Sequence, residues 1–335
     1  MMIVLGIESS CDDLSMSLLQ EGRPLATVTA SQVKDHRPYG GVVPEIASRK
    51  HLEHLEPTLE LALERAGIRP EQIDGVAATF APGLVGSLLV GLNFAKGLAF
   101  ALQRPFRGVH HIESHLFSPF LEHPPVFPFL GLVVSGGHTH LYWVEGVGHY
   151  HLLGHTVDDA AGEAFDKVAK AMGLPYPGGP AIEALAASGD PTAFEFALPR
   201  VKSGASHTSF SGMKTAALNH LENLPEARYP DLAASFQQSV VRALRHMVGR
   251  EWAERRQAPL LLAGGVACNR ALRSGLQGLA DEQGSSLVVP SPAYCTDNGA
   301  MVAWTGWQYL RRGETSPLSL NALARSDLGK SAKEA

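Results

Sequence analysis

From Ile3 to Leu19 the chain reads IVLGIESSCDDLSMSLL: an apolar strand, a small polar turn with acidic residues, and a second alternating strand. From Phe129 to Glu145 it reads FLGLVVSGGHTHLYWVE, with the same pattern and Ser135-Gly136-Gly137 at the turn. Two such units about 125 residues apart indicate two related halves that face each other. Each turn offers small residues and backbone N–H groups, which suits a phosphate-bearing nucleotide better than a structural role.

The first half alternates between strands and helices. Apolar residues at helical spacing predict a helix over 43–66 that ends at Gly67 as its C-cap. The other elements expected here are strands at 3–9, 14–19, 25–31, 73–79 and 106–110 and a helix at 84–102. This β-β-β-α-β-α-β order is that of a ribonuclease-H-like unit.

The second half repeats the order. The elements expected here are strands at 129–135, 140–144, 150–156, 260–263 and 286–289 and helices at 158–172, 232–255, 269–283 and 298–311. A loop-rich stretch covers 175–216, and the last helix could cross back to the first half. We therefore predict an α/β protein of two duplicated lobes with a central cleft. The first lobe is 1–125 with a C-terminal helix at about 298–325, and the second is 126–297 with a helical insertion at about 174–230.

Composition and charge narrow the class of protein. The chain has 335 residues, 45% of them hydrophobic, which allows two cores of ordinary size. Its net charge of −5 gives no sign of a general affinity for nucleic acid or membranes. Five arginines fall on one predicted helix, for which a solvated face is the favoured interpretation: Arg242, Arg245, Arg250, Arg255 and Arg256.

The cysteines and the N-terminus indicate a soluble cytoplasmic protein. Cys11, Cys268 and Cys295 are odd in number and scattered, with no C-x-x-C pair, which fits a reducing compartment and argues against a disulfide framework or a Cys-based zinc site. The N-terminus lacks the basic region of a secretory signal. The apolar stretch 84–102 carries Asn93 and Lys96, so we expect a helix under a sheet and no membrane span.

His111-Ile112-Glu113-Ser114-His115 follows a strand and is the first candidate for a metal site. If the segment is helical, the i,i+4 spacing puts both imidazoles on one face, although packing histidines explain H-x-x-x-H about equally well. Glu113 fits neither H-E-x-x-H nor H-x-x-E-H, so a metalloprotease lacks its general base. The best remote third ligand is Asp297, whose alternative role is the N-cap of the last helix.

Glycine-rich turns are candidates for nucleotide binding. Gly264-Gly265 follow an apolar strand and open a helix, where backbone N–H groups favour anions, but a tight turn without a ligand explains them too. Asn269 could hydrogen-bond a ribose or base. Neither the P-loop nor the Rossmann fingerprint is present.

Acidic residues lie at several predicted turns and helix starts. Asp166 could accept from a ribose hydroxyl, or it compensates a helix dipole. Gly178-Gly179-Pro180 with Glu183 is either a turn into a helix or a wall that faces a nucleoside. Asp12 and Asp13 lie at the first turn, where actin-like ATPases keep acidic residues for metal and water. The loop with His36 and the glycines of YGGVVP has no role that spacing decides.

Seven separated motifs, in this order, resemble the TsaD family of tRNA N6-adenosine threonylcarbamoyltransferases, also called Kae or Gcp. They run from residue 7 to about 303: GIESSCDD, GGVVPEIASRKH, APGLVGSLLVG, HHIESH, VVSGGHT, DDAAGEAFDKVAK and CTDNGAMVA. PGGP, SFSGMK and GGVACNR add to the resemblance. The ordered set makes coincidence improbable.

The resemblance implies an actin-like, sugar-kinase-like fold of two ribonuclease-H-like lobes. It also implies one divalent metal ion per subunit, Fe(II) or Zn(II), with His111, His115 and Asp297 matching the family's ligands. The positions that match the family's threonylcarbamoyl-adenylate contacts are Val133, Val134, Ser135, Gly136, Gly137, Asp166, Gly179, Glu183 and Asn269.

The implied reaction moves the threonylcarbamoyl group to N6 of the adenosine 3′ of the anticodon, in tRNAs that read codons beginning with A, and releases AMP. Because this substrate is a mixed anhydride, no protein nucleophile is required, and no general base is assigned. The implied partners are tRNA, a catalytically silent paralogue that dimerises through the first lobe, and a small ATPase.

Three positions depart from the family's usual pattern. Ser114 replaces the Ala or Gly before the second histidine, Leu14 stands where Thr follows the acidic pair, and Ala81 where Gly precedes Pro82-Gly83. One alternative is an actin-like ATPase or small-molecule kinase that binds ATP or ADP, with Asp12 or Asp13 orienting water. Another is an inactive assembly subunit, against which the complete set of metal ligands argues.

Overall fold

The structure, a computed structural model, describes residues 1–199, 201, 206–255 and 257–328, so Arg256 lies outside it. Two compact units make up the chain: unit 1 (Met1–Pro125 with Pro290–Ala335) and unit 2 (Val126–Val289). Residues 290–297, which the sequence analysis assigns to the second lobe, thus belong to unit 1. The backbone N–H of Ser291 donates to Glu122 Oε2 of unit 1 at 2.7 Å, which ties this segment to it.

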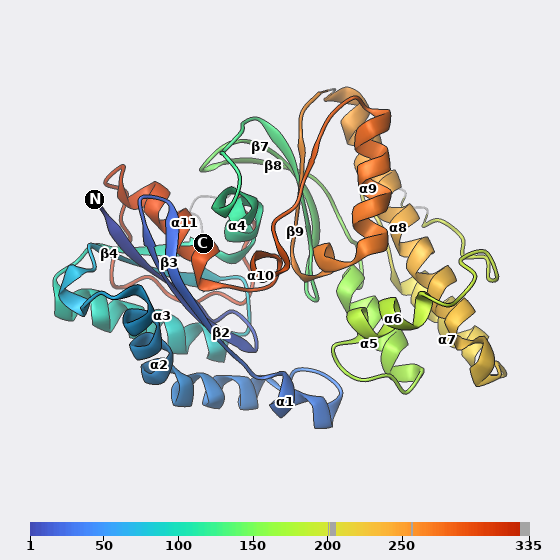
Figure 1. Cartoon of the computed structure of the whole chain (residues 1–335), viewed down its shortest axis with the longest axis horizontal. Helices are drawn as coiled ribbons and strands as arrows, with labels where there is room; N and C mark the ends of the chain where they lie inside the picture. Colours follow the sequence, from blue (N-terminus) through green and yellow to red (C-terminus); the bar gives the residue numbers. More distant parts are fainter. Residues whose placement is uncertain (200, 202–205, 256, 329–335) are drawn as a thin grey trace. The chain divides into compact units, whose positions relative to one another are not determined.

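Unit 1 is built on a five-stranded sheet in the order β3-β2-β1-β4-β5 (Figure 1). Its strands are β1 (Ile3–Glu8), β2 (Asp13–Gln20), β3 (Arg23–Ser31), β4 (Gly75–Ala81) and β5 (Phe106–His110). β2 pairs with β1 and β3 antiparallel, whereas β4 pairs with β1 and β5 parallel.

The helices of unit 1 cover both faces of this sheet. They are α1 (Val33–His36), η1 (Arg37–Tyr39), α2 (Pro44–Ala66), η2 (Pro70–Gln72), α3 (Val85–Leu102), α4 (His111–Phe117), η3 (Ser118–Leu121), α10 (Pro292–Cys295) and α11 (Gly299–Leu310). α2 begins with Pro44 in its first turn and ends at Gly67, whose φ of 66° is left-handed, so the predicted C-cap is confirmed.

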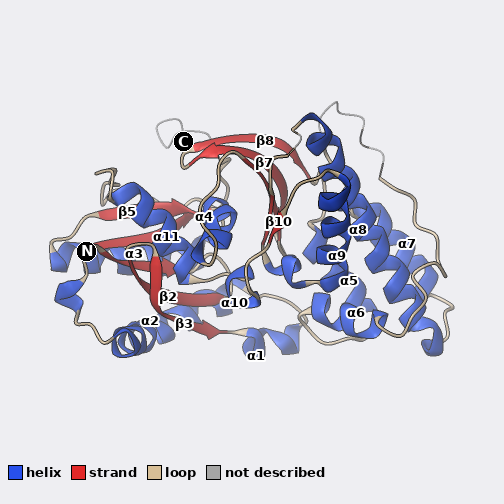
Figure 2. Ribbon diagram, turned by 45° about the horizontal axis from the view of Figure 1, so that its top comes forward, coloured by secondary structure: helices blue, strands red, loops and turns tan. Residues whose placement is uncertain are grey.

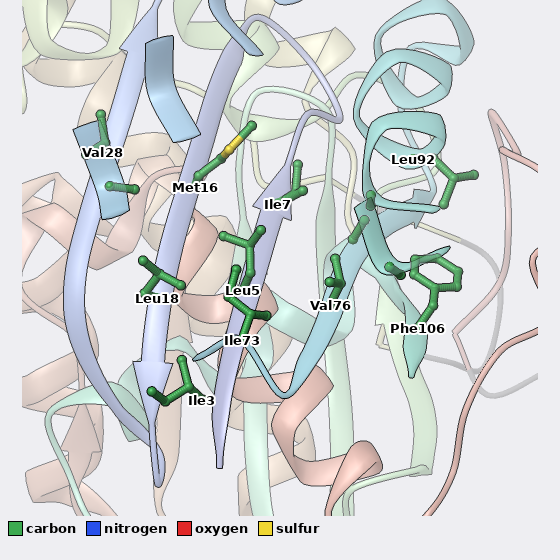
Figure 3. Packing of buried hydrophobic residues seen from close by; sticks show 14 of the residues in the cluster. Ile3, Leu5, Ile7, Met16, Leu18, Val28, Ile73, Val76, Leu92 and Phe106 are labelled. Atoms are coloured by element: carbon green, nitrogen blue, oxygen red, sulfur yellow. The ribbon is translucent and has the colours of Figure 1, made fainter. Parts of the chain in front are cut away.

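The alternation of β1 decides which side chains enter which core. Ile3, Leu5 and Ile7 pack into a buried cluster with Leu92 of α3 (Figure 3). Ala62 of α2 belongs to the same cluster. The intervening Val4 packs with Met301 of α11 on the opposite face. Since successive side chains alternate, Gly6 and Glu8 lie on the α11 face as well.

α3 is the one described helix long and apolar enough to cross a membrane by length and composition. A helix packed on a sheet passes the same test, so a single such helix is weak evidence. α3 packs against β4 and α2, as expected for a helix under a sheet.

Unit 2 repeats the strand order of unit 1. Its sheet runs β10-β9-β6-β7-β8, with antiparallel β6–β7 and β7–β8 pairs and parallel β6–β9 and β9–β10 pairs. Its strands are β6 (Phe129–Val134), β7 (Thr139–Gly146), β8 (His149–His155), β9 (Leu260–Ala263) and β10 (Leu287–Val288). The predicted duplication is therefore confirmed at the level of sheet topology.

The helices of unit 2 include two that the sequence analysis placed in a loop-rich stretch. They are α5 (Ala161–Ala171), α6 (Gly178–Ala186), α7 (Ser211–Leu221), η4 (Glu226–Arg228), α8 (Tyr229–Glu254), η5 (Gly265–Cys268) and α9 (Arg270–Glu282), of which α8 and α9 pack together (Figure 2). The expectation of a loop-rich stretch over 175–216 is wrong for α6 and for the start of α7, whereas a turn into a helix at Gly178-Gly179-Pro180 is one of the two interpretations given for these residues. Pro177 and Gly178-Gly179-Pro180 lie at the cap and first turn of α6, where N–H groups need no intrahelical partner, so these residues begin a helix.

Gly6 permits the close approach of β1 to α11, which yields a test of this packing. A Cβ at residue 6 would lie 2.3 Å from the Ala303 nitrogen and 2.3 Å from the Gly299 oxygen. We expect Gly6→Ala to lower the free energy of unfolding by about 3 kcal/mol or more. In α3, a Cβ at Gly97 meets nothing within 4 Å, so Gly97→Ala should stabilise by about 0.5–1 kcal/mol. Urea unfolding measures both, and equal stabilities would contradict the packing.

Candidate functional site

Two buried histidines share one face of α4. α4 begins directly after β5, and residues four apart in a helix lie one turn above each other. The His111 and His115 rings are 4.6 Å apart at their centroids and nearly perpendicular, at 82°. Helical spacing therefore puts the two imidazoles together, as the sequence predicts.

Asp297 approaches both rings from the segment that precedes α11. Its Oδ1 lies 3.0 Å from His115 Nε2 and 3.7 Å from His111 Nε2. The N-cap of α11 is the next residue, Asn298, whose side chain accepts from the Met301 N–H at 2.9 Å. Asp297 is thus not the helix cap, and its carboxylate faces the histidines.

His111, His115 and Asp297, here called the metal group, have the chemistry and spacing of a metal site. Their ligand atoms lie within 4.8 Å of one another, and the described residues offer no second group of this kind. Metal bonds of about 2.0–2.1 Å at tetrahedral angles put ligand atoms about 3.3 Å apart, between the two distances to Asp297. Two imidazoles and a carboxylate suit Zn(II) and Fe(II) alike.

A buried carboxylate lies behind His111. Glu8 is fully buried at the end of β1, and its Oε2 is 3.1 Å from His111 Nδ1. Burial lowers the pKa of His111, but the negative charges of Glu8 and Asp297 outweigh it and raise that pKa to about 9. Glu8 is not among the site residues predicted from the sequence, although a charged residue on a buried strand is a signal of this kind.

Glu113 faces away from the metal group. It is buried, and the hydroxyl of Tyr309 in α11 donates to its Oε1. This contact gives Glu113 a packing role between α4 and α11.

The acidic pair at the first turn divides between two environments. Asp13 begins β2 opposite Ser31 of β3, and burial raises its pKa to about 7, although Ser31 and the Gln32 backbone oppose the shift. Asp12 is half-buried. Neither belongs to the metal group.

The loop with an undecided role contains a buried chain of hydrogen bonds. Val43 N–H donates to His36 Nδ1 at 3.2 Å, so His36 Nε2 carries the proton that Gln32 Oε1 accepts at 3.3 Å. Gln32 Nε2 then donates to His51 Nδ1 at 3.1 Å, and His51 Nε2 donates to the Cys11 carbonyl at 2.9 Å. Because His36, Gln32 and His51 are fully buried, this chain fixes the loop to the turn that carries Asp12 and Asp13.

In unit 2, the Ser135-Gly136-Gly137 turn follows β6, which buries Val133 and Val134. Gly136 and Gly137 are exposed, and a Cβ at either would meet nothing within 4 Å. The neighbouring segments approach this turn through glycines. A Cβ at Gly162 of α5 would lie 2.6 Å from the Ser135 oxygen, and one at Gly264 2.3 Å from the Val134 oxygen.

Hydrogen bonds join the other predicted substrate residues in the same unit. Asp166 of α5 accepts from the Gly178 N–H, next to Gly179 at the start of α6, at 2.7 Å. Glu183 of α6 accepts from the Arg270 N–H at 2.9 Å and from its Nε at 3.0 Å. The residues called the unit 2 site, Val133–Gly137, Asp166, Gly179, Glu183 and Asn269, are therefore connected through β6, α5, α6 and the start of α9.

Asn269 has two structural roles that the sequence does not indicate. Its Oδ1 caps α9 by accepting from the Leu272 N–H at 2.9 Å, and its Nδ2 donates to Gln237 Oε1 at 2.7 Å. Gln237 lies in α8, far from any motif, so the sequence analysis missed it.

The arginines of α8 mostly bond within unit 2. Arg242 donates to the Phe196 carbonyl, and Arg245 to the Gly275 carbonyl and to Glu282. Arg255, the C-cap of α8, donates to Glu251. These contacts favour a structural face over a basic nucleic-acid surface.

Comparison with known proteins shows which protein family this chain resembles. A family model described as tRNA N6-adenosine threonylcarbamoyltransferase matches residues 23–304. Relatives with this description come from Geobacter sp. (strain M21), 53% identical over 326 residues (96% of this chain, 95% of the relative), and Pelobacter propionicus, 52% identical over 334 residues (98% of each).

Solved structures show the same fold at low identity. HypF of T. kodakarensis aligns with a TM-score of 0.63 and 17% identity over 92% of this chain and 48% of that chain. The (R)-2-hydroxyglutaryl-CoA dehydratase component A of Acidaminococcus fermentans aligns with a TM-score of 0.55 and 16% identity over 92% and 98%. The predicted actin-like fold of two duplicated α/β lobes is thereby confirmed.

The geometry of the metal group predicts a loss of bound metal on single substitutions. Asp297→Asn and His111→Ala should each reduce bound Zn(II) from one ion per chain to background, since each removes one of three ligands. Glu113→Gln exchanges a buried carboxylate on the same helix that is no ligand, and this variant should retain one Zn(II) ion per chain. Elemental analysis after reloading and dialysis gives the stoichiometry, and full retention in both ligand variants would refute the assignment.

Asp13 predicts a pH-dependent stability. Its folded pKa of about 7 exceeds the unfolded value of about 3.9. The stability from the protonated carboxyl is therefore full below about pH 4 and is lost as the pH rises through about 7. Asn at position 13 cannot ionise. We therefore expect the free energy of unfolding of Asp13→Asn, relative to that of the wild type, to increase by about 1–4 kcal/mol when the pH is raised from 4.5 to 8. Urea unfolding at pH 4.5 and at pH 8 checks this. The control is Glu60→Gln at an exposed position, whose free energy of unfolding should differ from that of the wild type by the same amount at both pH values.

Proposed function

The chain belongs to the tRNA N6-adenosine threonylcarbamoyltransferase family, and from this premise we propose the reaction it catalyses. It transfers the threonylcarbamoyl group from threonylcarbamoyl-adenylate to N6 of the adenosine 3′ of the anticodon, in tRNAs that read codons beginning with A. AMP is released.

The observation that carries this proposal is the complete metal group. His111, His115 and Asp297 come from two segments 182 residues apart and meet within 4.8 Å. A silent copy of the enzyme would be expected to lose one of these ligands. The intact group therefore supports an active transferase rather than an assembly subunit.

The metal group would hold one divalent ion, Zn(II) or Fe(II). When bound there, the ion would supply a Lewis acid that polarises a substrate oxygen. Glu8 behind His111 and the burial of both rings keep the ligands in place before substrate arrives.

The residues of unit 2 suit the adenylate. The amides of Gly136 and Gly137 are exposed at the end of β6 and can donate to a phosphate without steric hindrance from side chains. Asp166, Glu183 and Asn269 bind the starts of α6 and α9, which gives a rigid wall for the nucleoside. Because the carbonyl is already activated, the protein's task is orientation and charge stabilisation, and the attacking N6 amine displaces AMP.

We also propose the partners and the compartment. Four exposed apolar side chains on α2 and α3 suit a paralogue that binds unit 1: Leu52, Val85, Leu89 and Phe100. The net charge of −5 fits tRNA binding shared with that paralogue and with a small ATPase. Three free cysteines fit the cytoplasm.

An ATPase or kinase on the same fold would need an acid at the first turn to orient water. Asp13 pairs with Ser31 of β3, and the Ser31 side chain hydrogen-bonds its carboxyl, which ties Asp13 to the sheet. No other observation favours this alternative, in which ATP or ADP would bind.

The transferase is tested by nucleoside analysis. Unmodified tRNA is incubated with synthetic threonylcarbamoyl-adenylate, the partner paralogue and this protein, and the digested nucleosides are measured by mass spectrometry. We expect N6-threonylcarbamoyladenosine with the wild type and Glu113→Gln, and at least about 100-fold less with His111→Ala. Nucleotide hydrolysis without modified tRNA, from a folded, metal-loaded sample, would instead support the ATPase.

A further inference from the structure

We propose that Glu8 is the positioning residue of the metal group: it accepts the Nδ1 proton of His111 and thereby directs the Nε2 lone pair toward His115 and Asp297. This inference rests on the proposed metal site and assigns to a residue outside that site the control of its geometry.

Glu8 is held by donors from three different segments. Its Oε1 accepts from the backbone N–H of Ser10 at 2.6 Å. Its Oε2 accepts from the hydroxyl of Thr79 in β4 at 2.6 Å and faces His111 Nδ1 at 3.1 Å. With no solvent exposure and each oxygen bonded, the carboxylate has one position available.

The acceptor character of Glu8 decides which nitrogen of His111 carries the proton. A carboxylate only accepts, so the hydrogen between Oε2 and Nδ1 belongs to the imidazole. In the neutral imidazole, which is the form that binds a metal, Nε2 is then the atom that offers its lone pair, and it lies 3.7 Å from Asp297 Oδ1. Carboxylate–histidine–metal arrangements of this kind typically strengthen metal binding by about 10–100-fold.

Only one of the two histidines has this support among the described residues. His115 Nδ1 is buried and has no hydrogen-bond partner there. The orientation of the metal group relative to the sheet therefore depends on the hydrogen bond between Glu8 and His111. Burying a carboxylate on a strand whose other residues are apolar or glycine also costs desolvation free energy, which argues against a packing role alone.

Glu8→Gln separates positioning from packing because it keeps the shape and changes one atom from acceptor to donor. The Ser10 N–H requires an oxygen at the Oε1 position, so the amide nitrogen takes the place of Oε2. The Thr79 hydroxyl can rotate and accept from it. The amide nitrogen then faces the proton on His111 Nδ1 and leaves that proton to Ser10 Oγ, 3.1 Å away, a neutral acceptor that is weaker than a carboxylate. The tautomer protonated at Nε2, which blocks the metal-binding atom, is favoured as a result.

The experiment measures Zn(II) affinity by competition with a chromophoric chelator, using zinc alone as the probe, for the full chain. We expect Glu8→Gln to bind Zn(II) about 10–100-fold more weakly than the wild type, and Glu113→Gln to stay within about twofold. Thr79→Val, which removes one donor but leaves the carboxylate, should lose a few-fold and serves if Glu8→Gln does not fold. Melting temperatures of the metal-free variants are recorded beside the affinities.

A second readout follows the proton itself. In ¹⁵N-histidine-labelled, zinc-loaded protein, His111 should show a protonated Nδ1 and a metal-bound Nε2, and Thr79→Val should weaken the shift of that Nδ1 proton. If the wild type binds zinc but Glu8→Gln and Thr79→Val match it, or if His111 Nδ1 carries no proton, Glu8 is not the positioning residue. If the wild type binds no zinc, the proposed metal site fails, and this inference with it.

Discussion

The contact between β1 and the start of α11 is the constraint on which the metal group depends. Gly6 has no side chain where Gly299 and Ala303 pass over it, and a Cβ at Gly299 would lie 2.7 Å from the Ser17 nitrogen of β2. The Gly299 N–H also donates to Ser15 Oγ at 2.9 Å. Asp297 lies two residues before this contact and Glu8 two residues after Gly6, so the approach of two backbones places a candidate ligand and its supporting carboxylate.

The polar residues around this contact have a stability cost that packing alone does not explain. An apolar side chain in place of Glu8 would stabilise a strand whose other residues are apolar or glycine. The ionisation of Asp13 lowers the stability of the folded protein. Both lie at the ends of strands that carry the turn of Cys11 and Asp12. A second buried system, from His36 through Gln32 and His51 to the Cys11 carbonyl, holds the same turn from the other side. Natural folds retain such groups where a particular geometry matters more than the last few kcal/mol.

Local spacing predicted the features that depend on a few neighbouring residues. The i,i+4 histidines, the end of α2 at Gly67 and the repeated strand order could all be read from the sequence, because each follows from one helical or strand period. Asp297 could not be resolved into ligand or cap, since Asn298 beside it caps equally well and only the backbone angles decide. Glu8 and Gln237 were missed because their partners, His111 and Asn269, lie 103 and 32 residues away. For Gly178-Gly179-Pro180 the sequence left a turn into a helix and a wall facing a nucleoside open, and the structure shows that these residues form the first turn of α6.

The fold neighbours show why the site rather than the fold carries the functional argument. HypF and the dehydratase component share the architecture at 16–17% identity, and a fold of this kind hosts unrelated reactions. The metal group, its supporting carboxylate and the exposed glycine turn lie at or beside the ends of strands and helices: the carboxylate at the end of β1, the helix after β5, the turn after β6 and the segment before α11. Each position is where a backbone strand stops and its groups become available to a ligand. Asp166 and Glu183 of the unit 2 site lie within helices and Asn269 caps one, so the candidate residues lie on strand ends and helices alike, whereas the apolar faces of the sheets form the cores.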